Sequence, residues 1–428
     1  MNLIKYPTRE EWPSLLMRPH KDLTILRQTV ENVLDDVRQQ GDEAVRRYER
    51  KFDGVELADL RVSEAEMLEA ESLVSDELKA ALTLAHRNIS AFHEAQRFEG
   101  RKIETVPGVT CWQKAVAIER VGLYIPGGTA PLFSTVLMLA TPARIAGCKD
   151  IVLCSPPNRE GRLHPAILVA ARIAGVNHIY KIGGVQAIGA MAYGTESVPK
   201  VYKIFGPGNQ YVMAAKQAVS LGDVAIDMPA GPSEVAVVAD ETSNPVFVAA
   251  DLLSQAEHGM DSQVVLVSWH EDVLERVGQE VERQLALLPR REMAASSLQH
   301  SRFVLLHDAD EAMDFVNAYA PEHLILSVDA HEDLARRVVN AGSVFLGHYS
   351  CESAGDYASG TNHTLPTCGY ARAYSGVSLD SFIRKITFQK LTHEGVHSIG
   401  RAVELMAENE QLDAHKNAMT VRLQSISH

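Results

Sequence analysis

The sequence predicts an α/β protein whose strands form parallel sheets. From about residue 116 onward, short and continuously apolar strands alternate with helices, the pattern of a sheet covered by helices on both faces. Glycines gather directly after several strands, at the carboxyl ends where open α/β sheets hold their ligands. A chain of 428 residues also exceeds the usual size of one hydrophobic core, so two or three domains are expected.

The first hundred residues are predicted to be mostly helical. Residues 1–20 lack periodicity and are interpreted as an arm. Beyond them, apolar residues recur at helical spacing, and Ser63-Glu-Ala-Glu66 is the pattern of a capping box, which marks a helix start. The predicted helices cover residues 23–37, about 41–51, a segment from Ser63 and a segment from about Ser75.

Two α/β units of similar size follow the helical region. The predicted strands of the first unit are 116–124, 151–154, 178–182 and 201–205, and its helices are 134–146, 165–174, 186–193 and a helix that ends at 220. The predicted strands of the second part are 224–227, 234–238, 264–268, 303–306, 324–328 and 344–346. Residues 350–378 lack periodicity, and a loop of that length inside a compact chain is usually functional. From Ser381 the chain is predicted to be helical.

Composition narrows the class of protein. The formal net charge is −14, from 41 basic and 55 acidic side chains, which disfavours binding to a nucleic-acid backbone. The sequence shows neither an apolar run long enough to cross a bilayer nor a signal peptide, so no membrane association is expected. The five cysteines include no C-x-x-C pair, which fits a cytoplasmic enzyme better than a disulfide framework or a thiolate zinc site.

Gln255 and His258 form the first candidate site. They stand three residues apart at the end of a predicted helix that Gly259 terminates, so both side chains leave the same face. An amide oxygen and an imidazole that converge there can hold a metal ion or a small polar substrate. Taken alone, the simpler interpretation is a helix end whose histidine caps the last carbonyls.

Two further clusters carry polar groups suited to catalysis. Glu322 and His323 lie between a predicted helix and a strand, where a carboxylate that activates water and an imidazole that accepts a proton can face one cleft. A surface glutamate beside a half-buried histidine explains this pair equally well. In the 350–378 loop, Asp356 offers a hard oxygen ligand and His363 offers a second imidazole.

Some signals are negative or weak when taken alone. Glu410 and His415 lie in a polar terminal segment and are interpreted as solvated side chains. No G-x-G-x-x-G is present, because Gly206-Pro-Gly-Asn-Gln-Tyr211 carries tyrosine where the third glycine belongs. A nicotinamide cofactor would therefore bind without the usual Rossmann fingerprint.

Six motifs in order resemble the L-histidinol dehydrogenase family. The likeness runs from about residue 20 to Arg422 and is closest to the bacterial single-function members. The motifs are Gly122-Leu-Tyr-Ile-Pro-Gly-Gly128, Phe205-Gly-Pro-Gly-Asn209, Asp227-Met-Pro-Ala-Gly-Pro-Ser-Glu234, Ser254-Gln-Ala-Glu-His-Gly259, Pro321-Glu-His-Leu324 and Ser353-Ala-Gly-Asp-Tyr-Ala-Ser-Gly-Thr-Asn-His363.

The resemblance implies a fold of two incomplete Rossmann-like domains with N- and C-terminal helical extensions, in an intertwined homodimer. Together with the breaks near 124 and 232, it gives the expected domains. These are an arm over 1–20, a first α/β domain over 21–124 plus 232–375 on the substrate and zinc side, a second α/β domain over 125–231 on the NAD side, and a helical tail over 376–428 that reaches the partner subunit.

The resemblance also implies a reaction, the oxidation of L-histidinol to L-histidine through the aldehyde, with two NAD and one zinc. His323 would accept the alcohol proton, and Glu322 would activate the water for the second oxidation. The zinc ligands would be Gln255, His258, Asp356 and His415 from the partner subunit. The substrate contacts would be Ser233, His363 and Glu410 together with His323 and the zinc ligands, and the NAD contacts would be Tyr124, Gln186 and Asn209.

Three alternatives remain open at this point. A related zinc and NAD enzyme could oxidise another polar alcohol, but the residues that serve the imidazole and amino group are all present. A zinc hydrolase could use Glu322 and a metal-bound water, but no H-E-x-x-H pair is present and the NAD-contacting positions would then be unused. A catalytically silent metal-binding protein predicts gaps among the acid and base residues, and there are none.

Overall fold

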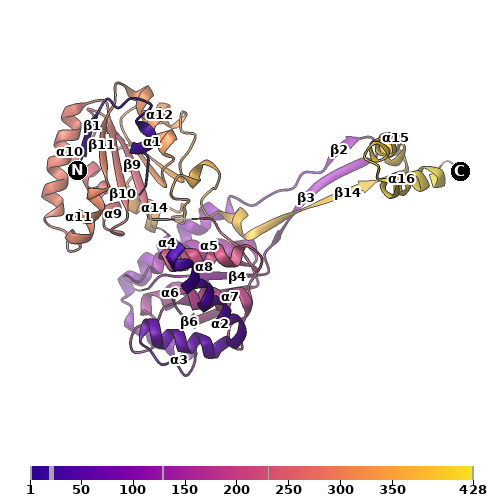
Figure 1. The fold of residues 1–428 in the computed structure, drawn as a ribbon, viewed down its shortest axis with the longest axis horizontal. Coiled ribbons are helices and arrows are strands. Elements are labelled where there is room, and N and C mark those ends of the chain that lie inside the picture. The colour runs from indigo at the N-terminus through magenta and orange to yellow at the C-terminus, as the bar shows by residue number, and fades with distance from the viewer. Residues whose placement is uncertain (1, 19–23, 128–129, 230, 427–428) are drawn as a thin grey trace.

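The computed structural model describes residues 2–18, 24–127, 130–229 and 231–426. Residues 19 and 20 of the predicted arm, Leu23 of the first predicted helix and Gly128 of the first glycine motif lie outside these ranges. Two parallel sheets form the body of the protein, and a third, antiparallel sheet forms an arm that projects from it (Figure 1). The predicted α/β class with parallel sheets is therefore confirmed.

Sheet A has six parallel strands in the order β1-β11-β10-β9-β12-β13. Alternate residues along β9, β10, β11 and β12 face two separate cores, because successive side chains in a strand point to opposite faces. Helices α9, α10 and α11 cover one face, and α1, α12 and α13 cover the other. The strands are β1 (Asn2–Lys5), β9 (Glu234–Ala239), β10 (Gln263–Ser268), β11 (Arg302–Leu305), β12 (His323–Ser327) and β13 (Ser343–Leu346). The helices are α1 (Trp12–Leu15), α9 (Pro245–Ala256), α10 (Glu271–Leu285), α11 (Arg291–Gln299), α12 (Ala309–Tyr319) and α13 (His331–Ala335).

The predicted N-terminal arm is wrong for residues 2–18. The β1 strand pairs with β11 at the edge of sheet A, and Trp12 packs edge-on against Phe315 in the core. A four-residue strand is too short to show a period of two, which is why the sequence pattern did not reveal it.

Sheet B has five parallel strands in the order β6-β5-β4-β7-β8. Helices α5 and α6 cover one face and α7 and α8 cover the other, so both faces are buried. The strands are β4 (Arg120–Tyr124), β5 (Asp150–Ser155), β6 (His178–Lys181), β7 (Lys203–Phe205) and β8 (Ala225–Ile226). The helices are α5 (Phe133–Ala146), α6 (Pro165–Ile173), α7 (Gly184–Tyr193) and α8 (Gln210–Ser220).

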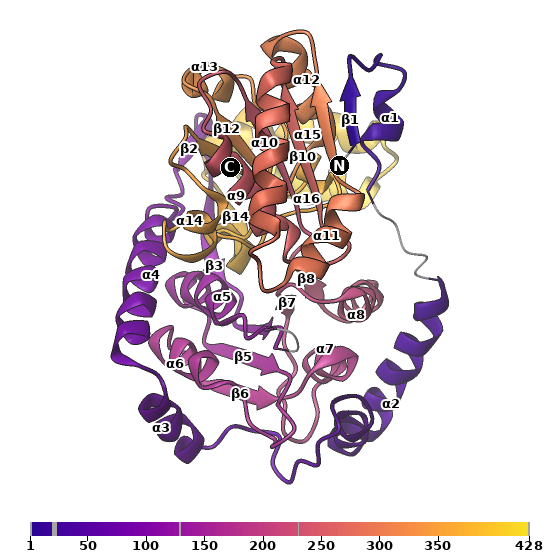
Figure 2. The ribbon, with the colours of Figure 1, turned by 90° about the vertical axis from the view of Figure 1, so that its left-hand side faces the viewer.

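The N-terminal helices belong with sheet B, which corrects the predicted domain over 21–124 plus 232–375. Helix α2 packs on the α7 and α8 side, whereas α3 and α4 pack on the α5 and α6 side. Figure 2 shows α2 and α4 on opposite flanks of the layer that contains β5 and β6. An amphipathic helix shows that one face is buried but not which sheet buries it. These elements are α2 (Thr24–Tyr48), the π-helical turn η1 (Glu49–Asp53), α3 (Glu64–Leu73) and α4 (Asp76–Glu94).

The arm is built from two distant parts of the chain. The β3 strand pairs antiparallel with β14 along nine residues, from Val109 with Leu391 to Ala117 with Ile383. The pair carries two helices at its tip, far from the body (Figure 1). The elements are β2 (Ile103–Val106), β3 (Val109–Ala117), β14 (Ile383–Leu391), α15 (His393–Asn409) and α16 (Asp413–Ile426). The tail predicted to be helical from Ser381 is therefore a strand over its first part.

The segment 350–378 also differs from its predicted form. It contains the helix α14 (Glu352–Tyr357) and a 3-10 turn (Tyr370–Arg372), and a second 3-10 turn (Leu379–Phe382) follows it. In the described residues, no helix combines the length and the apolar character that crossing a bilayer requires.

Candidate active site

The predicted catalytic residues meet at the amino ends of the sheet A strands. Ser233 directly precedes β9, Glu322 directly precedes β12, and His323 is the first residue of β12. Gln255 lies in the last turn of α9, and His258 follows the end of that helix. The parallel strands β9 and β12 pair with His323 beside Val235, so the two chain segments enter the sheet side by side. This edge is opposite to the carboxyl edge at which open α/β sheets usually bind ligands.

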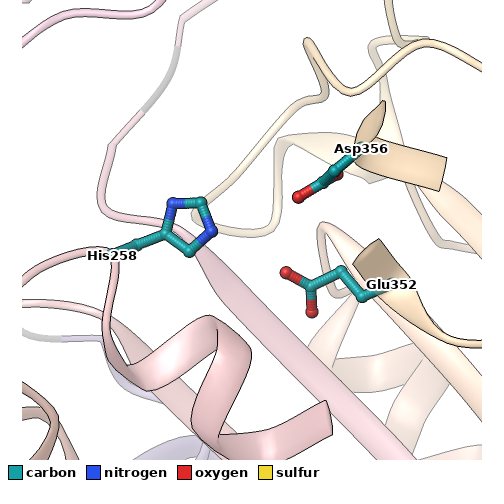
Figure 3. A group of neighbouring side chains, drawn as sticks. All are labelled: His258, Glu352 and Asp356. Carbon is teal, nitrogen blue, oxygen red and sulfur yellow. The ribbon is translucent and has the colours of Figure 1, made fainter. Parts of the chain in front are cut away.

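One group of side chains has the composition and spacing of a metal site. His258, Glu352 and Asp356 each offer a ligand atom, and these atoms all lie within 4.8 Å of one another. Figure 3 shows the imidazole and both carboxylates pointing toward a common centre. Sequence reasoning missed Glu352, although it stands four residues before Asp356 on α14 and therefore shares a helix face with it. The signal was hidden because residues 350–378 were interpreted as a loop.

Gln255 is fully buried behind this group. The Gln255 side-chain amide lies between the Glu352 carboxylate and the Glu234 backbone N–H, and its two terminal atoms are within 3.0 Å of these neighbours. The structure thus brings Gln255, His258 and Asp356 together, as predicted, and adds Glu352 to them.

Glu322 and His323 are both buried beside the group formed by His258, Glu352 and Asp356. The Glu322 carboxylate accepts the Glu234 backbone N–H at 2.9 Å, and His323 Nε2 lies 3.6 Å from Asp356 Oδ1. Both ring nitrogens of His323 are buried without a hydrogen-bond partner. Burial raises the pKa of Glu322 to about 8. A buried carboxyl with a raised pKa and a buried imidazole without a hydrogen-bond partner are candidates for proton transfer.

The charges around His323 indicate whether a cation fits the group formed by His258, Glu352 and Asp356. Burial lowers the pKa of His323, but Glu352, Glu322 and Asp356 outweigh it and raise the pKa to about 10. A neutral imidazole therefore needs a positive charge close to these carboxylates. A divalent cation held by His258, Glu352 and Asp356 would supply that charge, and nitrogen and oxygen donors are suitable zinc ligands. The residues present fit such an ion.

His363 lies in the same site and is held from two sides. Its Nδ1 lies 2.9 Å from the Asp356 carbonyl oxygen, and its Nε2 lies 3.1 Å from Thr135 Oγ1 on α5. Thr135 belongs to the sheet B unit, so His363 lies where the two sheet units meet. Burial lowers the pKa of His363 and favours the neutral ring.

Two predicted site residues are not brought to this place within one chain. Glu410 and His415 are exposed and lie at the tip of the arm, at the junction of α15 and α16 (Figure 1). A site that includes them requires a second subunit.

The predicted NAD-contacting residues lie at the carboxyl edge of sheet B. Tyr124 ends β4, and its hydroxyl accepts the Gly184 N–H at 3.2 Å, at the start of α7. The Gln186 amide donates to Glu49 at 2.8 Å, and Gly183 N–H also donates to Glu49. Burial raises the pKa of Glu49 to about 7. Sequence reasoning did not find Glu49, because it comes from the helical segment that wraps the sheet.

The third predicted NAD contact caps a helix. The Asn209 side chain accepts the N–H groups of Tyr211 and Val212 at the start of α8. The preceding turn requires glycine at Gly206, where φ is 122° and an added Cβ would lie 2.1 Å from the Tyr124 carbonyl oxygen.

A buried ion pair supports the same turn. Asp227 accepts the Gly206 N–H at 2.9 Å, and Lys216 donates to the Gly206 carbonyl at 2.8 Å and to Asp227 at 2.5 Å. The two side chains are 1% and 2% exposed. Asp227 therefore binds the backbone N–H of Gly206 and Lys216 binds its carbonyl oxygen, and together they fix the turn.

Replacing Lys216 with methionine is expected to lower the free energy of unfolding by about 3–5 kcal/mol, because Asp227 would be left as a buried, unpaired charge. Urea unfolding of the full chain measures this. Arg283→Met is the matched control, since its partner Glu280 pairs with it on the surface, where solvent screens the pair, and the loss should be much smaller. Equal losses in the two variants would contradict the assignment.

The fold and the site together define an α/β enzyme, with two parallel sheets and a carboxylate–histidine centre where the sheet units meet. Comparison with known proteins identifies the family to which this enzyme belongs. The sequence profile of the histidinol dehydrogenase family matches residues 16–423, and the chain belongs to that family. It is an oxidoreductase.

Close relatives and a solved structure agree with this assignment. Histidinol dehydrogenase from Bacteroides thetaiotaomicron is 66% identical over 426 residues, which cover 100% of both chains. Histidinol dehydrogenase from Yersinia pestis is 50% identical over 423 residues, which cover 98% of this chain and 95% of the relative. The crystal structure of histidinol dehydrogenase from Elizabethkingia anophelis superposes with a TM-score of 0.98 at 55% identity and covers 100% of this chain and 99% of that one.

Proposed function

We propose that the protein catalyses the NAD-dependent, four-electron oxidation of L-histidinol to L-histidine through L-histidinaldehyde. The observation that carries the proposal is the convergence of Glu322 and His323 with the group formed by His258, Glu352 and Asp356 at one end of sheet A. Membership of the histidinol dehydrogenase family supports this choice of reaction. His323 would be the base, Glu322 would activate water, and the group formed by His258, Glu352 and Asp356 would hold the cation.

Zinc would be held by Gln255, His258, Asp356 and the partner subunit's His415, as the family resemblance implies. Glu352 is a further candidate ligand or a charge partner for these residues. When bound, zinc supplies positive charge that orients the polar groups of the substrate.

In the first half-reaction, His323 would accept the hydroxyl proton of the alcohol, and NAD, when bound, would supply the hydride acceptor. In the second, Glu322 takes a proton from water as the water oxygen bonds to the aldehyde carbon. The adduct would be the anion of the aldehyde hydrate, with the water proton held on Glu322. NAD, when bound, would serve as the hydride acceptor that converts this anion to the acid. Burial of Glu322 and His323 keeps bulk water away from both steps. Ser233, His363 and the partner's Glu410 would contact the substrate.

The NAD site would lie at the carboxyl edge of sheet B, with Tyr124, Gln186 and Asn209 as its contacts. Supporting this, Gly206, Gly183 and Gly184 lie at the same edge, where a ligand can approach the backbone closely.

The active form would be an intertwined homodimer whose arms exchange. The arm leaves large apolar side chains exposed on its strands, on its helices and in the turn between α15 and α16, and a single subunit does not cover them. These include Ile103, Ile386, Phe388, Met406 and Leu412. Each of the five cysteines is a free thiol, which supports a reducing, cytoplasmic setting.

The expected result with purified protein, zinc, NAD and L-histidinol is about two NADH for each histidine formed, because two hydrides leave one carbon. Absorbance of NADH and chromatography of histidine measure this ratio. One NADH with an aldehyde product would contradict the two-step proposal. Absence of NADH from zinc-loaded protein would exclude histidinol as the substrate.

A further inference from the structure

Arg18 forms a buried ion pair directly behind the catalytic residues. It follows α1, and its guanidinium binds the Glu234 carboxylate in a fork, with Nε–Oε2 at 2.7 Å and Nη2–Oε1 at 3.0 Å. The two side chains are only 13% and 1% exposed, and the guanidinium carbon lies 3.8 Å from the centre of the Tyr319 ring. A two-pronged, stacked and buried guanidinium is a rigid connection.

The same guanidinium also holds the turn that leads into Glu322. Arg18 Nη2 donates to the Tyr319 carbonyl at 2.6 Å and lies 3.5 Å from the Ala320 carbonyl. Ala320 ends α12 with φ at 52°, a left-handed conformation that a residue with a side chain rarely adopts. Such a conformation persists when its surroundings fix it. Pro321 alone separates this turn from Glu322.

Glu234 completes the connection from the other side. Its backbone N–H, the first of β9, donates to Glu322 Oε2 at 2.9 Å, while its side chain is bound to Arg18. Arg18 therefore contacts both the residue that holds the Glu322 carboxylate and the turn that carries the Glu322 backbone.

We propose that Arg18 is a positioning residue for Glu322. It joins β9 to the end of α12 and so fixes where the Glu322 carboxylate stands for the water-activating step. The inference rests on the proposed function of Glu322. The hydrogen bonds that link Arg18 to Glu322 through Glu234 and the Tyr319 carbonyl do not depend on that function. Lysine carries the same charge on a single nitrogen, so it cannot bind two carboxylate oxygens and a carbonyl in this fork geometry.

The test uses the full-length, zinc-loaded protein with Arg18→Met and Arg18→Lys. For Arg18→Met, kcat for histidinaldehyde oxidation is expected to fall by about 10- to 100-fold, because a shift of about 1 Å at a reacting group has that effect. The KM values for aldehyde and NAD should stay within about twofold of wild type, since Arg18 lies behind the site. Arg18→Lys is expected to recover less than half of the lost kcat.

Arg120→Met is the matched control. Arg120 also binds a carboxylate, Asp150, and a carbonyl, that of Lys200, but at the amino edge of sheet B. It is expected to lose stability without losing kcat per zinc-loaded site. An unchanged kcat in Arg18→Met, or full recovery in Arg18→Lys, would overturn the proposal.

A crystal structure of Arg18→Met gives a readout that does not depend on turnover. The Glu234 N to Glu322 Oε2 hydrogen bond should be broken in that variant and intact in Arg120→Met. An intact bond at its present 2.9 Å would overturn the positioning role even if wild-type protein failed to oxidise histidinol. Failure of wild type with histidinol, together with a broken bond, would refute only the reaction proposed for Glu322.

Discussion

Glu322→Gln is expected to lower kcat for aldehyde oxidation by about 10²- to 10⁴-fold, while alcohol oxidation loses much less. Glutamine keeps the shape of Glu322 and can still accept the Glu234 N–H, which is now bound at 2.9 Å, but it cannot take a proton from water. The measurement supplies L-histidinol and L-histidinaldehyde separately and follows NADH in each case.

The pH dependence adds a second readout of the same variant. Because burial raises the pKa of Glu322 to about 8, its carboxyl is largely protonated below that pH and becomes a base above it. Wild-type aldehyde oxidation should therefore rise with pH through this region, and Glu322→Gln should lack the rise. Glu280→Gln, on the surface of α10, is the control. Equal losses in both half-reactions would refute the division of labour between Glu322 and His323.

His258→Asn and His415→Asn are each expected to abolish turnover, and a mixture of the two to restore it. His258 lies beside Glu352 and Asp356 in the body, whereas His415 lies on α16, the helix at the tip of the arm. If sites are shared, a mixed dimer has one site with both changes and one with none. Random reassociation should then give about a quarter of wild-type activity, since half of the dimers are mixed.

The complementation is measured after the two variants are unfolded, mixed and refolded together. His397→Asn, an exposed histidine on α15, should remain active alone and serves as the control for changes on the arm. Lack of recovery from inactive but folded parents would show that each site is completed within its own chain.

Much of the fold follows from local pattern. Apart from β1, the strands of both sheets were predicted from short apolar segments. The Ser63 capping box also forms as predicted, with the Glu66 side chain accepting the Ser63 N–H at 2.8 Å. Periodicity cannot assign α2, α3 and α4 to sheet B, because that choice depends on contacts between distant segments. The β14 strand was missed because Ile383, Ile386 and Phe388 fit helical spacing nearly as well as strand spacing.

The candidate site, like the fold, could be predicted only in part from the sequence. The Gln255 and His258 spacing and the Glu322-His323 pair were visible in the sequence, and the structure brings them together. Glu352 and Arg18 were not visible as site residues. Each acts through a partner that is close in space but distant in sequence, Gln255 for Glu352 and Glu234 for Arg18. A single sequence carries no signal for the pairing of Arg18 with Glu234, whereas Glu352 stands four residues before Asp356 and would have been found if α14 had been recognised as a helix.

Because β3 is synthesised before β14, one strand of the arm is exposed before its partner strand exists. The β3 strand is synthesised well before its partner β14, because Val109–Ala117 precede Ile383–Leu391 in the chain. Until then β3 is an open strand edge, which invites pairing with other nascent chains. Lys114 on β3 and Lys385 and Lys390 on β14 are exposed, as charges that discourage unintended edge pairing usually are. A chain truncated before Ile383 lacks β14 and should therefore aggregate as well as be inactive, because β3 would lose its pairing partner along its full length.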